Sequence, residues 1–139
     1  MRLVLDTNVV VAALLWSGPP RRLLDRTIDS AHTLYSSPAL IDELTHTLHY
    51  QKLARRIGQS GTSALGLVAQ YAALVTLLSP LQVPRVIEHD VDDDQLIALA
   101  VAAQADLIIS GDRKHLLPLG SHEGIRIVDA AQALRLIGE

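Results

Sequence analysis

The chain has 139 residues, 49% of them hydrophobic, which fits one compact domain over residues 1–139 with a sizeable core. It contains no cysteine, which excludes disulfide bridges, thiolate zinc sites and cysteine nucleophiles and is typical of the reducing cytoplasm. A net charge of −3 argues against binding nucleic acid through a broad basic surface. No apolar run is long enough to span a bilayer, so we expect a cytoplasmic protein without membrane contact.

Strand-like and helix-like patterns alternate along the whole chain. Short apolar runs typical of buried strands occupy residues 2–5, 33–36, 74–78, 106–110 and 125–128. Helical patterns lie near residues 9–16, 20–29, 38–49, 51–57, 62–73 and 92–104, with a short helix after Asp112 and a last one capped by Asp129. The strands are apolar throughout, which is typical of a parallel sheet covered on both faces. We therefore predict a three-layer α/β/α fold.

Two aspartates emerge directly after predicted strands. Asp6 follows strand 2–5, and Asp112 follows strand 106–110 after a single glycine. In parallel α/β sheets, ligands bind beyond the carboxyl ends of the strands. If these two strands are neighbours, the side chains of Asp6 and Asp112 converge at one edge of the sheet.

A third acid, Glu43, lies on the helix that Pro38 opens. At about 100° per residue, Glu43 lies closer to the apolar stripe of that helix than Asp42 does. Glu43 can therefore flank the core and reach a cleft, while Asp42 faces water. Taken alone, an acid in this position would simply stabilise the helix dipole.

A run of acids, Asp90-Val91-Asp92-Asp93-Asp94, precedes the apolar segment LIALAVAA. One of them is expected to be a helix N-cap, which is the usual role of such residues. Three consecutive acids are more than a cap requires, because their charges repel one another. The helix that follows is apolar nearly all round, so its periodicity does not select the acid that faces the sheet edge.

An acidic cluster at a sheet edge favours a metal site. Hard cations such as Mg²⁺ and Mn²⁺ prefer oxygen ligands, and such ions can activate water or clamp a phosphodiester. Without a cation, carboxylates at this spacing would raise one another's pKa values. The cluster alone does not identify the substrate.

Four motifs in chain order resemble those of the PIN-domain family and together cover essentially the whole chain. They are Asp6-Thr7-Asn8 after LVL, Ser37-Pro38 through Asp42-Glu43-Leu44, Asp94 followed by Ile97-Ala98 and Ala100, and Ile109-Ser110-Gly111-Asp112. The stretches DVDDDQL and ADLIISGDRKHLL are most similar to the VapC-like branch, the toxin components of toxin–antitoxin pairs.

The resemblance implies a parallel sheet of about five strands, Mg²⁺ or Mn²⁺ at the acidic cleft, and endonucleolytic hydrolysis of RNA. Its catalytic and metal-binding acids correspond to Asp6, Glu43, Asp94 and Asp112. It also implies an RNA substrate and a small antitoxin as partners, and a homodimer is compatible with the apolar excess of the chain.

The resemblance also assigns supporting roles to neighbouring polar residues. Asn8 and Ser110 would position water or a ligand, and Thr7 would bond a carboxylate or the start of a helix. Asp92 and Asp93 would support the ligands or cap their helix. Gln95 stands where this branch commonly has a basic residue, so the sequence departs from the family at that phosphate contact.

Two other classes of function remain open at this point. One is a different metal-dependent phosphotransfer enzyme, although a receiver domain would need a lysine after a later strand and a dehalogenase-type phosphatase an aspartate where Asn8 stands. The other is a non-catalytic module that binds nucleic acid through the same fold.

Several further residues are interpreted as structural or surface residues. Trp16 is expected to be a packing residue rather than a platform on which bases stack. His115 is interpreted as a surface or loop residue that could approach a phosphate. The remaining candidates are pairs of basic residues expected to be ordinary solvated surface: Arg21-Arg22, Arg55-Arg56 and Arg113-Lys114.

Overall fold

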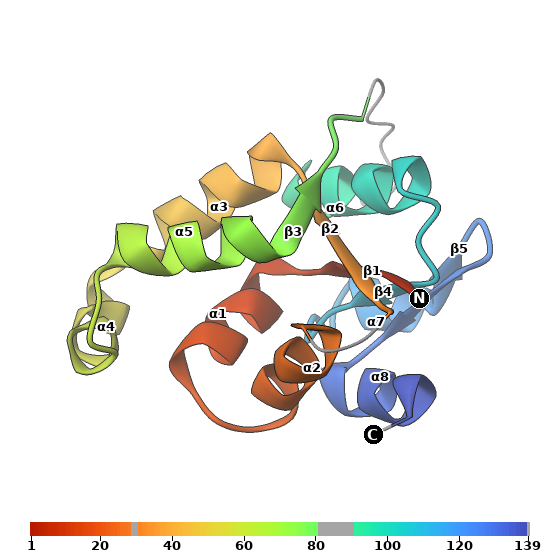
Figure 1. Cartoon of the computed structure of the whole chain (residues 1–139). Coiled ribbons are helices and arrows are strands. Elements are labelled where there is room, and N and C mark those ends of the chain that lie inside the picture. Colours follow the sequence, from red (N-terminus) through yellow and green to blue (C-terminus); the bar gives the residue numbers. More distant parts are fainter. Residues whose placement is uncertain (29–30, 81–90, 139) are drawn as a thin grey trace.

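Six strands form one twisted sheet in the part of the chain that this computed structural model describes, residues 1–28, 31–80 and 91–138. Their order across the sheet is β3-β2-β1-β4-β6-β5 (Figure 1). The strands are β1 (Arg2–Leu5), β2 (Thr33–Ser36), β3 (Val75–Leu77), β4 (Leu107–Ile109), β5 (Ser121–His122) and β6 (Ile125–Val128). Every neighbouring pair is parallel except β5 and β6, which are antiparallel.

The helices are distributed over both faces of this sheet. They are α1 (Thr7–Leu15), α2 (Pro19–Ile28), α3 (Pro38–Leu48), the 3₁₀ turn η1 (Gln51–Leu53), α4 (Ala54–Gln59), α5 (Ala64–Leu74), α6 (Val91–Ala102), α7 (Leu116–Leu119) and α8 (Ala130–Ile137). The predicted three-layer α/β/α fold and its five parallel strands are confirmed. The short strand β5 was not predicted, because Ser121 and His122 are polar and give no apolar signal.

Alternation along the strands divides the core in two. Leu3 and Leu5 of β1 belong to a cluster packed by α1, α2, α3, α5 and α8, whereas Val4 between them belongs to a cluster packed mainly by α6 and α7. Successive side chains of a strand point to opposite faces of its sheet, so a continuously apolar strand requires helices on both. The apolar composition of β1 therefore accounts for the layered architecture.

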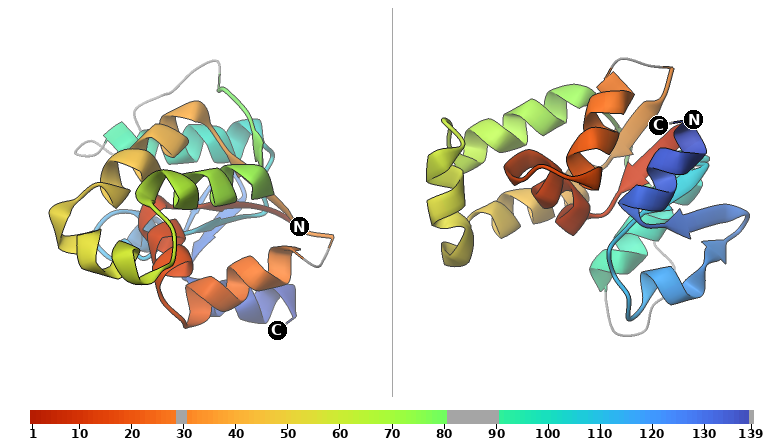
Figure 2. Two further views of the ribbon diagram at one scale, coloured as in Figure 1. Left: turned by 60° about the vertical axis from the view of Figure 1, so that its left-hand side comes forward. Right: turned by 90° about the horizontal axis from the view of Figure 1, so that it is seen from below.

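Helices α3, α4 and α5 extend beyond the sheet on one side of the molecule (Figure 2). α3 packs against α5 along this extension, and α3 also packs against α1 and α6. The chain from α3 to α5 therefore leaves the sheet, turns through α4 and returns to β3. This arrangement places α3 beside the carboxyl edge of the sheet and α4 far from it.

Local hydrogen bonds set the beginnings of three helices. The Asp6 side chain accepts from the Thr7 backbone N–H, so α1 begins at Thr7 rather than near residue 9 as predicted. Ser37 caps α3 through a bond from the Leu40 N–H, with Pro38 in the first turn. Asp129 caps α8 as predicted and forms a reciprocal capping box with Gln132.

α6 begins at Val91, one residue before the predicted start, so Asp92, Asp93 and Asp94 lie within its first turn and do not precede it as caps. Asp90 lies outside the described residues. Acids in a first turn are favoured by the positive end of the helix dipole, which offsets part of their mutual repulsion. No helix in the described ranges is long and apolar enough to cross a membrane.

We predict that Asp129→Ala lowers the free energy of unfolding by about 1 kcal/mol, the usual cost of losing an N-cap. The Asp129 carboxylate accepts the Gln132 N–H at 2.8 Å, and the Gln132 side chain accepts the Asp129 N–H at 3.0 Å. Urea denaturation of the purified proteins measures the change. Asp42→Ala, which removes an exposed acid from α3, is the matched control and should change stability much less. Equal stability losses in the two variants would contradict this role of the capping box.

Candidate active site

A serine hydroxyl joins the ends of two neighbouring strands. β1 and β4 are parallel neighbours in which Leu5 is opposite Ile109, and the Asp6 N–H donates to the Ile109 carbonyl at 2.9 Å. The buried Ser110 hydroxyl donates to Asp6 Oδ2 at 2.8 Å and accepts the Asp112 N–H at 3.0 Å. The two strands are neighbours, as the prediction required, and Ser110 bridges the Asp6 side chain to the backbone of the turn that carries Asp112.

Both oxygens of the Asp6 carboxylate are oriented by the protein. Oδ1 accepts the Thr7 N–H at 2.8 Å, while Oδ2 accepts the Ser110 hydroxyl. Asp6 is half-buried and Thr7 is buried, so this carboxylate stands at the sheet edge with limited freedom to turn. The remaining lone pairs of its oxygens can face a ligand in a defined direction.

The Asp112 carboxylate is held by the backbone of the turn that follows it. Oδ1 accepts the N–H groups of Lys114 at 3.0 Å and His115 at 3.2 Å, and Oδ2 lies 3.6 Å from His115 Nδ1. Burial raises the pKa of Asp112, but those two N–H groups, the charge of His115 and a side-chain hydrogen bond with Asp93 lower it further than burial raises it. The expected increase in pKa was therefore wrong for Asp112, because the turn stabilises its charged form.

Helix α6 brings further acids to this edge. Asp93 is 6% exposed and Asp94 is fully buried. One carboxylate oxygen each of Asp93 and Asp112 and one ring nitrogen of His115 lie within 4.8 Å of one another. His115 lies in the turn after Asp112 and is partly exposed, as predicted for a loop residue. The structure also groups its ring and Asp93, which was predicted only to support the ligands, with Asp112.

For three other predicted residues, the structure gives the position on the fold. Glu43 is half-buried on α3, which packs against α1 and α6, while Asp42 is exposed as expected. Asn8 is exposed and lines, with Ser110 and Gly111, a cavity of about 320 Å³ beside the acidic edge. The side chain of Asp92 lies outside the described part of the structure.

The donors at this edge fit a hard divalent cation. Carboxylate oxygens of Asp93 and Asp112 come together, and Mg²⁺ and Mn²⁺ prefer such ligands. Asp6 is linked to the Asp112 turn through Ser110 and is not one of the three side chains in this group. A cation would also compensate the negative charge that adjacent, partly buried carboxylates accumulate. Asp93 on α6 and Asp112 after β4, with His115, therefore form a candidate metal centre at the carboxyl edge of the sheet.

Comparison with known proteins identifies the class of this fold and site. The model of the PIN domain matches residues 2–114, which include all four predicted acids, and the chain belongs to the PIN-domain family. None of the curated proteins matches the chain.

Two solved structures have the same fold. A chain of VapBC2 from Rickettsia felis, determined bound to a DNA fragment from its promoter, is 12% identical with a TM-score of 0.63 over 91% of this chain and 97% of that chain. A chain of VapBC-1 from nontypeable Haemophilus influenzae is 16% identical with a TM-score of 0.59 over 94% of this chain and 99% of that one. At these identities the likeness shows the shared fold.

A comparison of variants shows which of Asp93 and Asp94 is a metal ligand. We predict that Asp94→Asn melts higher than the parent in chelator, because it removes a charge from a fully buried position in an acidic cluster. Saturating Mn²⁺ should then stabilise the parent more than this variant, since a ligand present at 100 times its Kd adds about 2.7 kcal/mol.

Thermal unfolding with chelator and with Mn²⁺ measures both effects, and Asp93→Asn is the matched variant. An Asp94→Asn protein that keeps the full metal response, beside an Asp93→Asn protein that loses it, would remove Asp94 from the ligand set.

Proposed function

We propose that this chain is a divalent-metal-dependent endoribonuclease that hydrolyses RNA phosphodiester bonds. Asp6, Glu43, Asp94 and Asp112 are the proposed ligands of Mg²⁺ or Mn²⁺, and Asp93 and His115 lie against Asp112 in the same site. The observation that carries the proposal is the hydrogen-bonded series from Asp6 through Ser110 to the Asp112 turn. Membership in the PIN-domain family supports the nuclease class.

Neighbouring hydroxyl and backbone N–H groups orient the acids that are proposed to hold the cation. Ser110 keeps Asp6 and the Asp112 turn in a fixed relation, and the Lys114 and His115 N–H groups keep the Asp112 carboxylate charged and oriented. When bound, the cation would supply a water of lowered pKa and neutralise charge on the phosphate. Asn8, exposed at the rim, is placed to contact water or the RNA.

The substrate and the metal requirement are tested together. We expect the purified protein to cut a mixed pool of single-stranded RNA internally in Mg²⁺ or Mn²⁺ and to leave it intact in chelator. Asp6→Asn should lower the rate at least a hundredfold, because it weakens a ligand that the protein orients at both oxygens. Sequencing of the cut ends shows the position of cleavage.

The matched control is Glu123→Gln, which makes the same carboxylate-to-amide change at an exposed position between β5 and β6. Cleavage that persists at full rate in a verified metal-free sample would reject the metal-dependent mechanism. A metal-binding protein that binds RNA without cutting it would instead favour the non-catalytic module.

A second part of the proposal concerns a partner. The chain has the fold of chains from the complexes named VapBC2 and VapBC-1, and we propose that it is the toxin of a toxin–antitoxin pair. A small antitoxin protein would then bind it and suppress cleavage of cellular RNA. This places its action in the cytoplasm, where both RNA and a newly synthesised partner are available.

Expression of the chain alone should therefore slow bacterial growth, and expression of Asp6→Asn should not. The difference follows because only the parent retains the proposed metal ligand. Growth rate, measured with matched protein levels and with RNA integrity recorded in the same cultures, tests the proposal. Equal growth of the two strains while the parent protein remains an active nuclease would reject the toxin role and retain the nuclease.

A further inference from the structure

The one tryptophan of the chain is on the surface. Trp16 follows the last residue of α1 and is 43% exposed, so a large part of its ring faces solvent. The guanidinium carbon of Arg56 lies 5.5 Å from the centre of its ring. An exposed indole beside an arginine combines a flat apolar surface with a fixed positive charge.

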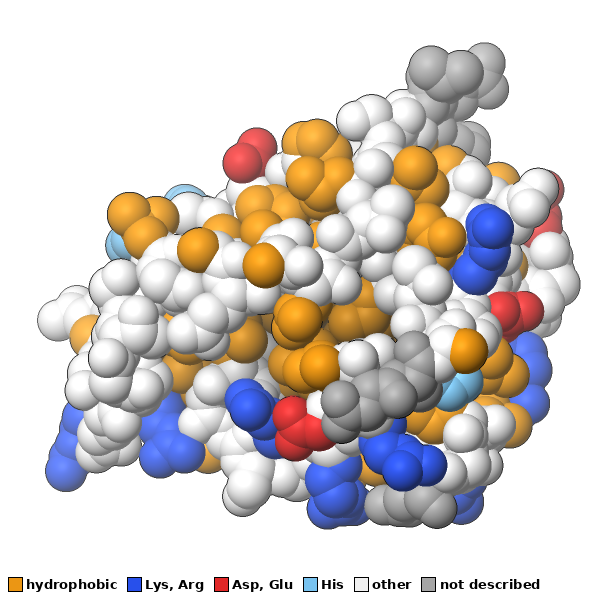
Figure 3. Space-filling model, in the orientation of Figure 1, with side chains coloured by type: hydrophobic (Ala, Val, Ile, Leu, Met, Phe, Trp, Pro, Cys, Tyr) orange, Lys and Arg blue, Asp and Glu red, His pale blue; other side chains and the backbone are white. Residues whose placement is uncertain are grey.

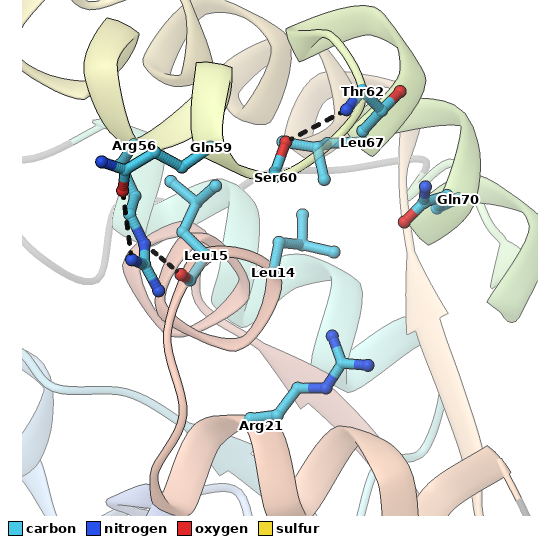
Figure 4. A pocket seen from close by; sticks show the side chains of 9 residues that line it. All are labelled: Leu14, Leu15, Arg21, Arg56, Gln59, Ser60, Thr62, Leu67 and Gln70. Carbon is cyan, nitrogen blue, oxygen red and sulfur yellow. Dashed lines mark hydrogen bonds between the residues drawn. The ribbon is translucent and has the colours of Figure 1, made fainter.

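A cavity of about 220 Å³ lies at the same end of α1 (Figure 4). Arg21 reaches it from α2 and Arg56 reaches it from α4, with Leu14 and Leu15 of α1 between them. Gln59 and Gln70 complete its polar lining from α4 and α5. Two arginines from separate helices therefore share one small cavity.

Part of the role of these arginines is structural. Arg56 Nε donates to the Leu15 carbonyl at 2.6 Å, and Arg21 Nη1 donates to the Ala13 carbonyl at 3.4 Å, so both bind carbonyls at the end of α1. Arg56 Nη1 also donates to Gln59 Oε1 at 3.4 Å, and Arg21 Nε lies 3.3 Å from Asp25 Oδ1. A guanidinium carries five N–H donors, which is more than these contacts use.

The balance of charge at this end of the molecule is positive. The carboxyl end of α1 contributes about half a negative charge, and Asp25 contributes one. Among the described residues around the cavity, Arg21 and Arg56 and the exposed cations Lys52 and Arg55 on η1 and α4 stand against them. Figure 3 shows basic side chains along this lower edge of the molecule. The chain therefore has a basic edge despite its net charge of −3.

The chemistry of this edge favours single-stranded nucleic acid as the ligand. A backbone phosphate can accept from guanidinium groups that line the same cavity, and a neighbouring unpaired base can stack on the exposed part of the Trp16 ring. A second pair of the same kind lies nearby, because Lys52 Nζ is 5.8 Å from the ring centre of Tyr50, which is 44% exposed. An acidic peptide would satisfy the arginines but would leave the aromatic faces unused.

We propose that the Arg21–Arg56 cavity and Trp16 form a binding site for the phosphate backbone and one base of the RNA substrate, outside the acidic centre. The inference rests on the proposed ribonuclease function. α1 begins beside Asp6 and ends beside Trp16, and its nine residues span about 13 Å. A few nucleotides of one extended RNA strand can therefore reach from this site to the acids.

Tryptophan fluorescence tests the site directly, because Trp16 is the chain's single indole. In chelator, where RNA stays intact, a short single-stranded RNA of mixed sequence should quench this fluorescence. Arg21→Gln should weaken binding severalfold and reduce the slope of log affinity against log salt by about 0.7, the value for one lost phosphate contact. Arg126→Gln on β6 makes the same charge change at the other end of the sheet and should leave both values unchanged.

A second variant tests stacking separately from charge. Trp16→Ala should weaken the binding of fluorescein-labelled RNA roughly tenfold without changing the salt slope. Leu65→Ala, which truncates a side chain on α5 that is 63% exposed, is its control and should bind like the parent. Gln70→Glu places an acid at the cavity from an exposed position and should also weaken binding, which covers the case of an Arg21→Gln protein that fails to fold.

The outcomes separate this site from the proposed activity. RNA that is cut by the protein in Mg²⁺ but does not quench Trp16 in chelator would overturn the site and leave the nuclease. RNA that quenches Trp16 in a protein without cleavage would support the site and reject the nuclease. Stronger quenching by a polyglutamate peptide than by RNA would assign this edge to a protein partner and overturn the proposal.

Discussion

The hydroxyl of Ser110 is the contact on which the arrangement of the acidic site depends. It is fully buried between two neighbouring parallel strands, where it donates to Asp6 and accepts from the backbone of Asp112. A serine can do both at once because its oxygen carries one hydrogen and two lone pairs. Since a buried polar atom that loses its partner is costly, this bridge also ties the geometry of the acids to the stability of the sheet.

The turn after β4 adds a second constraint. Backbone N–H groups of Lys114 and His115 converge on one oxygen of Asp112, so the polypeptide itself provides the positive end of the local dipoles. The carboxylate therefore remains charged although it lies among other acids. The backbone N–H groups offset part of the repulsion among the acids, so the fold can hold the Asp112 carboxylate in its charged form beside the other acids without a bound cation.

Much of this organisation could be predicted from the sequence, because the strands are short and apolar. All five parallel strands follow from such runs, and the placement of Asp6 and Ser110 follows from strand ends that adjacency brings together. α6 is different: Leu96 to Ala100 are all buried, so no polar face distinguishes Asp93 from Asp94. Position in the fold, rather than periodicity, brings Asp93 to Asp112.

Two residues have contacts that were not predicted from the sequence. His115 had a usable signal, since an aspartate before a turn often accepts backbone N–H groups two and three residues later, which would have placed His115 near Asp112. Trp16 offered a weaker signal. Large aromatic residues are buried on average, whereas Trp16 directly follows the end of α1 and is 43% exposed. The local course of the backbone thus decides the environment of these two side chains, which a hydrophobicity pattern does not reveal.

The outer strands of the sheet restrict how this molecule can associate with others. Within the described residues, β3 has three residues and β5 has two, and these are the strands at its two borders. Edges of that length offer too few backbone groups to template the addition of a further strand, which also protects the fold against aggregation through its sheet. In the described part of the chain, the surface available to a binding partner is therefore formed mainly by helices and loops.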